Sequence, residues 1–247
     1  MNRMLVLLRK DLKEILKSKV TYTYLIIPVF LSWPSVESAK SVVDTLVRNG
    51  ASQAEMLASA QAVTNVVFYT IPLIIVMLVC SVLSSYAVIM DKNKRSIESL
   101  LATPLSLRQV WIAKDLAVTI PGSIIGVVMS ILVLAVINAI AYGPAMGVIV
   151  LPSALSMVTG IILVPLLTFF VVGIVTCLQL ILTNPRFASF IFSVLFLVAF
   201  FPTVVTQFGL KLDYSLIYLI VILVFLAINY FLSRLLTKER IVLSSKA

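Results

Sequence analysis

Long apolar runs separated by short charged segments make up most of this chain. A membrane-spanning helix needs roughly 20 mostly apolar residues to cross about 30 Å of hydrocarbon. Six runs approach or exceed that length, at 20–36, 65–90, 116–141, 147–182, 187–206 and 215–233. Backbone groups in lipid must be hydrogen-bonded within their own segment, so each run predicts a helix. The pattern therefore predicts an all-α polytopic membrane protein with six transmembrane helices.

Three parts of this pattern are irregular. The run 20–36 is short and contains two prolines, whereas 147–182 is longer than one crossing needs and contains Pro152 and Pro165. Because proline breaks or kinks a helix, we expect an interfacial or tilted piece over 147–157 before the true span. The first external loop, 37–64, has mixed charge and weak amphipathicity, which predicts a short surface helix.

Charge placement decides the orientation. Hydrophobic residues make up 61% of the chain and charged residues 12%, with a formal net charge of +9. The basic residues lie between the apolar runs and form no basic stripe, which argues against a nucleic-acid-binding protein. Lys and Arg number 16 on the side of the termini, and only Lys40, Arg48 and Lys211 fall on the other side. Basic loops stay in the cytoplasm, so both termini are expected there, in a multi-pass protein of the cell membrane.

Residues 1–19 show a helical amphipathic pattern ahead of the transmembrane domain (20–236) and the cytoplasmic tail (237–247). Apolar and charged side chains fall on opposite sides of a helical wheel: Leu5, Leu8, Leu12 and Ile15 against Lys10, Lys13, Glu14 and Lys17. This arrangement predicts an interfacial helix in the headgroup plane. It serves either as a plain anchor on anionic lipid or as a docking element for a partner, and the sequence leaves both open.

The loop between the second and third predicted spans, 91–115, is the richest charged segment. A helix-like run reaches Pro104, and Ser106 then provides an N-cap for a second short helix over 107–114. A helix, a proline break and another helix form an elbow.

Part of this loop carries a family signature. The segment 96–114 reads SIESLLATPLSLRQVWIAK, and it resembles the signature region of the ABC type-2 permeases. The matching residues are Glu98, Leu100, Leu101, Thr103, Pro104, Ser106 and Lys114. Ser96 and Ala113 stand where that family usually has glycine.

The resemblance implies the membrane subunit of an ATP-driven exporter, paired with a second copy or a homologous permease. In this family a cytoplasmic ATP-binding-cassette subunit docks through the loop and the N-terminal helix. The residues expected to couple to that ATPase are Arg95, Glu98, Thr103, Pro104, Ser106, Arg108 and Lys114. The chain has no Gly-rich phosphate loop, so ATP and magnesium are expected on the partner, with no cofactor in this chain and no enzymatic activity of its own.

Candidate path residues and rival classes complete the prediction. Five polar or aromatic side chains at membrane depth are candidates to contact the substrate: Tyr69, Asn138, Phe192, Phe196 and Phe200.

A secondary carrier or channel without an ATPase stays as the alternative, although the spans lack the mid-membrane ionisable residue that such carriers use. The absence of histidine, and cysteines only within apolar runs, argue against a metal site or a membrane enzyme. The substrate, and whether the two permeases are identical, are not specified.

Overall fold

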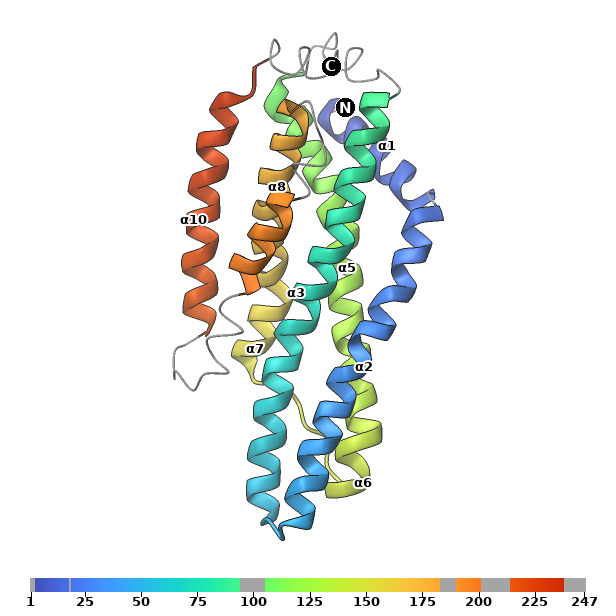
Figure 1. Ribbon diagram of the computed structural model, residues 1–247, viewed down its shortest axis with the longest axis vertical. Coiled ribbons are helices and arrows are strands. Elements are labelled where there is room, and N and C mark those ends of the chain that lie inside the picture. The colour runs from blue at the N-terminus through green and yellow to red at the C-terminus, as the bar shows by residue number, and fades with distance from the viewer. Residues whose placement is uncertain (1–2, 18, 94–104, 183–189, 201–213, 238–247) are drawn as a thin grey trace.

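Helices aligned along one long axis form the molecule (Figure 1). The computed structural model describes residues 3–17, 19–93, 105–182, 190–200 and 214–237, and every regular element in these ranges is helical. The elements are α1 (Arg3–Lys17), α2 (Lys19–Arg48), α3 (Gln53–Asn93), α5 (Leu107–Ile137), the π-helix Asn138–Tyr142, α6 (Gly143–Met146), α7 (Ala154–Val158), the π-helix Thr159–Leu163, α8 (Val164–Ile181) and α10 (Tyr214–Leu235). A further short helix covers Phe190–Phe200.

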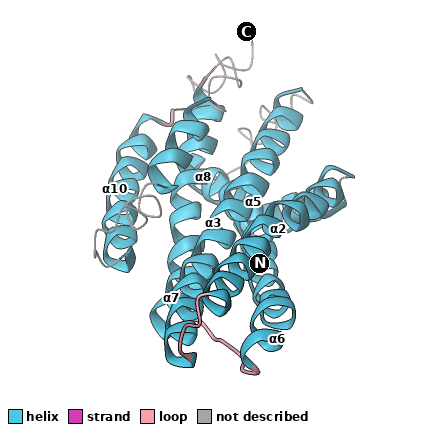
Figure 2. Cartoon of the chain, turned by 60° about the horizontal axis from the view of Figure 1, so that its bottom comes forward, coloured by secondary structure: helices cyan, strands magenta, loops and turns pink. Residues whose placement is uncertain are grey.

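The two ends of the bundle differ. At one end, here called the α1 end, α1 lies across the bundle and α10 finishes (Figure 1). At the opposite end, here called the hairpin end, α2 and α3 meet at a turn and extend further along the axis than α10 does (Figure 1). Figure 2 shows the bundle with this end brought forward. α1 and the C-terminal part of α10 therefore share one end, as an even number of crossings requires.

Four described helical segments are long and apolar enough to cross a membrane. They are Gln53–Ser84, Leu107–Met146, Ala154–Ile181 and Ser215–Leu235. The other two predicted spans do not reach this length or apolarity within the described residues. The apolar part of α2 is interrupted by Pro28, Pro34 and hydroxyl side chains, and only Phe190–Phe200 of the run 187–206 is described as a helix. The fold is that of an all-helical membrane protein.

The first external loop, 37–64, differs from the prediction. Instead of a loop with a short surface helix, α2 continues to Arg48 and α3 begins at Gln53, so the two helices form a hairpin. Its seam is apolar, with Val36, Ala39 and Val43 of α2 and Ala60 of α3 buried in one core. A shared seam of this kind keeps both helices regular beyond the predicted membrane boundary. The turn uses Gly50 at φ 67°, a conformation that glycine adopts without steric cost.

The predicted interfacial piece at 147–157 also differs. Residues 147–153 are not helical, and a continuous helical run begins at Ala154 and reaches Ile181. Side chains satisfy the backbone of this link: the Asn138 amide donates to the Val150 carbonyl and accepts from its N–H, at 3.1 and 2.7 Å. The side-chain Oδ1 of Asn65 accepts from the Ser153 N–H at 2.7 Å. The span thus begins at a capped helix start and not through a tilted surface segment.

α3 separates two hydrophobic cores. The first core joins α3 to α1, α2, α5 and α6, and the second joins its opposite face to α8, α10 and Phe190–Phe200. On the first side, Gly122 and Gly126 let α5 approach α3 closely. A Cβ at Gly126 would lie 2.3 Å from Cγ2 of Val76, which is sterically impossible. The small-xxx-small spacing is therefore a packing contact between these two helices.

Candidate functional site

The start of α5 is set by a capping box at Ser106. The Ser106 hydroxyl accepts from the Gln109 N–H at 3.3 Å, and the Gln109 side chain accepts from the Ser106 N–H at 3.0 Å. The predicted N-cap and first helical residue are confirmed. The predicted short helix 107–114 is wrong, because it forms the first two turns of α5, which runs to Ile137. Buried Val110, Ala113 and Ala117 carry one apolar face through the predicted boundary, so nothing ends the helix there.

α1 packs directly on these first turns of α5. Leu7 of α1 is buried with Val110 and Ala113 of α5, and Leu8 packs against the same group. Ile15, near the end of α1, is buried in the first core. Of the four residues predicted for the apolar side, Leu8, Leu12 and Ile15 face the bundle, whereas Leu5 is 55% exposed. Leu7 takes its place, so the buried face is rotated from the predicted one.

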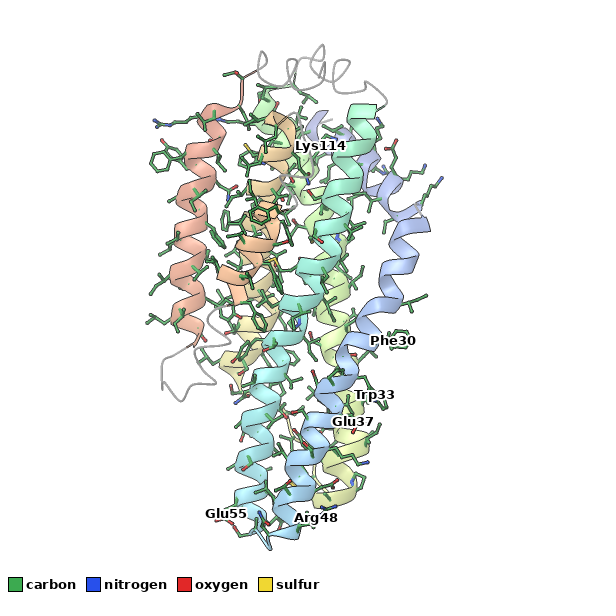
Figure 3. The ribbon with its side chains drawn as sticks, viewed as in Figure 1. Phe30, Trp33, Glu37, Arg48, Glu55 and Lys114 are labelled. Carbon is green, nitrogen blue, oxygen red and sulfur yellow. The ribbon has the colours of Figure 1, made fainter. Side chains whose placement is uncertain are left out.

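An ion pair closes this contact. Nζ of Lys114 on α5 lies 3.5 Å from Oδ2 of Asp11 on α1, and the two side chains are only 2% and 10% exposed. In Figure 3, Lys114 lies inside the bundle at the α1 end. A charge this deeply buried needs an opposite charge beside it, because desolvation is costly. Lys114, predicted as a coupling residue, therefore fastens two elements of its own chain together.

Sequence reasoning missed Asp11. The signal was present, because Asp11 lies four residues after Leu7 and four before Ile15, on the side of the helix that is buried. A carboxylate within an apolar stripe predicts a buried cationic partner. Which residue is that partner is seen only in the structure, since Lys114 is 103 residues away from Asp11 in sequence.

The opposite face of α1 is charged and accessible. Lys10, Lys13, Glu14 and Lys17 are all exposed, as predicted for the polar side of the interfacial helix. Arg108 and Ser106, at the start of α5, are exposed as well. We call Lys10, Lys13, Glu14, Lys17 and Arg108 the charged face. The other predicted coupling residues, Arg95, Glu98, Thr103 and Pro104, lie outside the described residues.

Neutral hydrogen bonds tie the remaining helices to this end. The Ser84 hydroxyl of α3 donates to Oε1 of Gln179 on α8 at 2.9 Å. The Trp111 indole N–H of α5 donates to the Gly173 carbonyl of α8, also at 2.9 Å. α1, α3, α5 and α8 therefore form a connected unit at the α1 end.

The candidate path residues divide into two groups. Tyr69, Phe192, Phe196 and Phe200 all belong to the second core. The ring of Tyr69 meets that of Tyr218 edge to face, with centroids 6.0 Å apart, and the rings of Phe196 and Phe200 stack at 5.8 Å. The structure thus brings a tyrosine of α3 and the three predicted phenylalanines into one cluster between α3, α8 and α10.

Asn138 stands apart from this aromatic cluster. It lies on the first-core side, at the end of α5, and both ends of its amide are engaged. Besides the link to Val150, its nitrogen donates to the Leu134 carbonyl at 2.9 Å. In this arrangement Asn138 holds the 147–153 link in place.

The geometry places two features on one molecule: a charged face on a firmly held helix, and an aromatic cluster inside the bundle. No family model, curated protein or solved structure matches this chain.

Proposed function

We propose that this chain is the permease subunit of an ATP-binding-cassette exporter. In this proposal it has six spans, α2 and the helix around Phe190–Phe200 completing the four described ones. The α1 end faces the cytoplasm, both termini lie there, and the protein resides in the cell membrane. A separate ATPase binds ATP and magnesium, and a second permease, identical or homologous, completes the transporter.

The buried Asp11–Lys114 pair is the observation that carries this proposal. It joins the interfacial helix to the last residue of the family-like segment. A partner that moves either element therefore moves the other, because separating them would expose a buried charge to an apolar environment. Such a joint is what a permease needs at its contact with a motor.

The helix that receives this motion is long enough to carry it across the bundle. α5 has 31 residues, or about 46 Å of helix. Close packing against α3 at Gly122 and Gly126 passes a displacement of α5 to the centre of the bundle. Movement at the α1 end thereby reaches the face of α3 that carries Tyr69 and the second core.

The charged face provides the docking surface in this proposal. Lys10, Lys13 and Lys17 extend from α1 and Arg108 from the start of α5. Leu105, the first described residue that follows Glu98 in the chain, packs against Leu7 and Val110 beside this face. A soluble ATPase with an acidic edge would complement it, and such rim charges mainly determine specificity and association rate.

The aromatic cluster is the proposed substrate path. Tyr69, Phe192, Phe196 and Phe200 offer apolar and aromatic contacts with one phenolic hydroxyl, which suits a hydrophobic or amphipathic substrate. The cluster is packed here, so transport requires α8, α10 or Phe190–Phe200 to separate from α3.

Co-purification tests the proposal. The chain is solubilised gently from native membranes, and the proteins that accompany it are identified by mass spectrometry and assayed for ATP hydrolysis. We expect a P-loop ATPase in stoichiometric amount. Recovery of the chain without an ATPase, under conditions that preserve other membrane complexes, would favour the carrier or channel class instead.

A substitution at Glu98 tests the coupling role. We expect Glu98→Ala to retain the complex and its ATP hydrolysis but to lose transport, whereas Asp44→Ala on the exposed side of α2 should transport normally. Normal transport by the Glu98→Ala complex would refute the assignment of Glu98.

A further inference from the structure

Asp115 is a second buried acid at the α1 end, next to Lys114 in sequence. It is only 2% exposed. Its Oδ1 accepts from the Thr119 hydroxyl one turn later on α5, at 3.3 Å. Lys114 is already matched by Asp11, so ionised Asp115 would add an uncompensated negative charge to a site about 12 Å along α5 from its first residue.

Asn229 of α10 presents an oxygen to the same place. Its nitrogen donates to the Phe170 carbonyl at 2.7 Å and to the Phe225 carbonyl at 2.9 Å. These two acceptors fix the orientation of the amide, because the opposite orientation would set its oxygen against two carbonyl oxygens. Oδ1 of Asn229 must therefore point away from them, and among the described contacts no donor reaches it.

Gly173 of α8 packs against both of these oxygens. A Cβ at Gly173 would lie 2.7 Å from Oδ1 of Asn229 and 2.9 Å from Oδ2 of Asp115. Both oxygens therefore lie against the same backbone position and fill the place that a side chain would take. Two buried acceptor oxygens that meet at one point in this way repel each other unless a positive charge or a shared proton lies between them.

We infer that Asp115 and Asn229 form a binding site for one monovalent cation, either a proton or a sodium ion. A proton on Oδ2 of Asp115 would make that acid a donor to Oδ1 of Asn229 and remove the charge. A sodium ion would take both oxygens as ligands and balance the carboxylate, with water completing its coordination. Either occupant satisfies the two oxygens and the electrostatics of the buried site.

The neighbouring titratable groups do not supply this charge. The Cys80 thiol of α3 is directed to the Val118 carbonyl. Lys114 forms the ion pair with Asp11 of α1. On α8 the Cys177 thiol is directed to the Leu232 carbonyl, and on α10 Arg234 is exposed and interacts with Tyr230. Among the described residues, therefore, none supplies a counter-charge for Asp115.

This inference does not depend on the proposed function. An exporter and a secondary carrier could each contain such a site, and occupancy is measured on the chain itself. The site is also separate from the aromatic cluster, because it lies between α5, α8 and α10 at the α1 end, whereas the cluster packs against α3.

Two measurements on the purified full chain in lipid nanodiscs test the site. Infrared spectroscopy near neutral pH detects a protonated carboxyl group, and equilibrium binding of radioactive sodium, with choline as the replacement cation, detects a sodium ion. For the proton we expect a carboxyl band that Asp115→Asn removes and that the exposed control Asp44→Asn retains. For sodium we expect one ion per chain, and an affinity at least about tenfold weaker in Asn229→Leu.

Each outcome bears directly on the inference. A protonated band without sodium binding assigns a proton, and stoichiometric sodium binding without the band assigns sodium. If Asp115→Asn does not fold, the Asn229→Leu variant decides, because loss of its hydrogen bond must shift the band or weaken sodium binding. Wild-type protein with neither the band nor saturable sodium binding would overturn the inference.

Discussion

The α1 end and the hairpin end of this bundle are held together by different chemistry. At the α1 end, buried charges on α1 and α5 meet across 103 residues of sequence, with Asp115 buried beside them. At the hairpin end, buried polar contacts are neutral: Tyr142 bonds Thr64 and Ala60, and Asn138 bonds Val150. The charged residues labelled there, Glu37, Arg48 and Glu55, lie on the surface (Figure 3).

The two kinds of contact differ in how they contribute to stability. At the hairpin end, apolar packing and neutral hydrogen bonds hold the helices and the 147–153 link. Buried ion pairs bring little net stability compared with apolar packing, yet breaking one is costly. The α1 end therefore has a joint that resists separation strongly, which suits an element on which a partner acts.

The largest expected effect follows from breaking the ion pair. Lys114→Met removes the positive charge that faces Asp11, and we expect a loss of about 3–5 kcal/mol in unfolding free energy. Thermal or denaturant unfolding of the purified protein in a defined detergent measures it. The exposed control Lys13→Met should change little. In the double variant Asp11→Asn with Lys114→Met, stability should largely return, and a loss equal to the sum of the single variants would contradict the pairing.

A smaller effect is expected where Asn138 holds the 147–153 link. Asn138→Ala removes both hydrogen bonds to buried Val150, and we expect a loss of about 2 kcal/mol. The matched control is Asn49→Ala in the exposed hairpin turn. Hydrogen exchange at Val150 should rise in the first variant only; unchanged exchange there would show that the amide does not hold the link.

Tyr142 tests the neutral contacts between α3 and the end of α5. Its hydroxyl accepts from Thr64 and donates to Ala60, each at 3.2 Å, so Tyr142→Phe should cost about 1 kcal/mol. Tyr230→Phe, at an exposed position, provides the comparison. A loss as large as that of Lys114→Met would remove the distinction between the two ends.

The smallest effect is expected at the hairpin turn. The Ser52 hydroxyl caps the first turn of α3 by accepting from the Glu55 N–H at 3.4 Å. We expect Ser52→Ala to lower stability by about 0.5–1 kcal/mol, with Ser38→Ala on the exposed face of α2 as control. An unchanged unfolding midpoint would show that apolar packing alone fixes the hairpin.

Periodicity predicted the fold class and the polar side of α1, because both depend on apolar spacing that is readable within one segment. The N-cap at Ser106 was equally local. The errors occurred where packing against another helix decided the outcome: α2 and α3 stay helical beyond the predicted span boundary through their shared seam, and α5 continues past 114 because Ala113, Ala117 and Val118 carry its buried face onward. The partnership of Asp11 with Lys114, and of Asp115 with Asn229, could not be read from spacing, since each joins residues more than 100 positions apart.

The most direct test compares the two ends as docking sites in native membranes. A photo-reactive residue is placed singly at Lys13 or Arg108 on the charged face, and at Arg48 or Glu55 at the hairpin end, and the cross-linked proteins are identified by mass spectrometry. We expect a P-loop ATPase to be captured from Lys13 and Arg108 and from neither hairpin position. Capture of the ATPase from the hairpin end, or its absence from the charged face while other proteins are captured there, would contradict the proposed role of the α1 end.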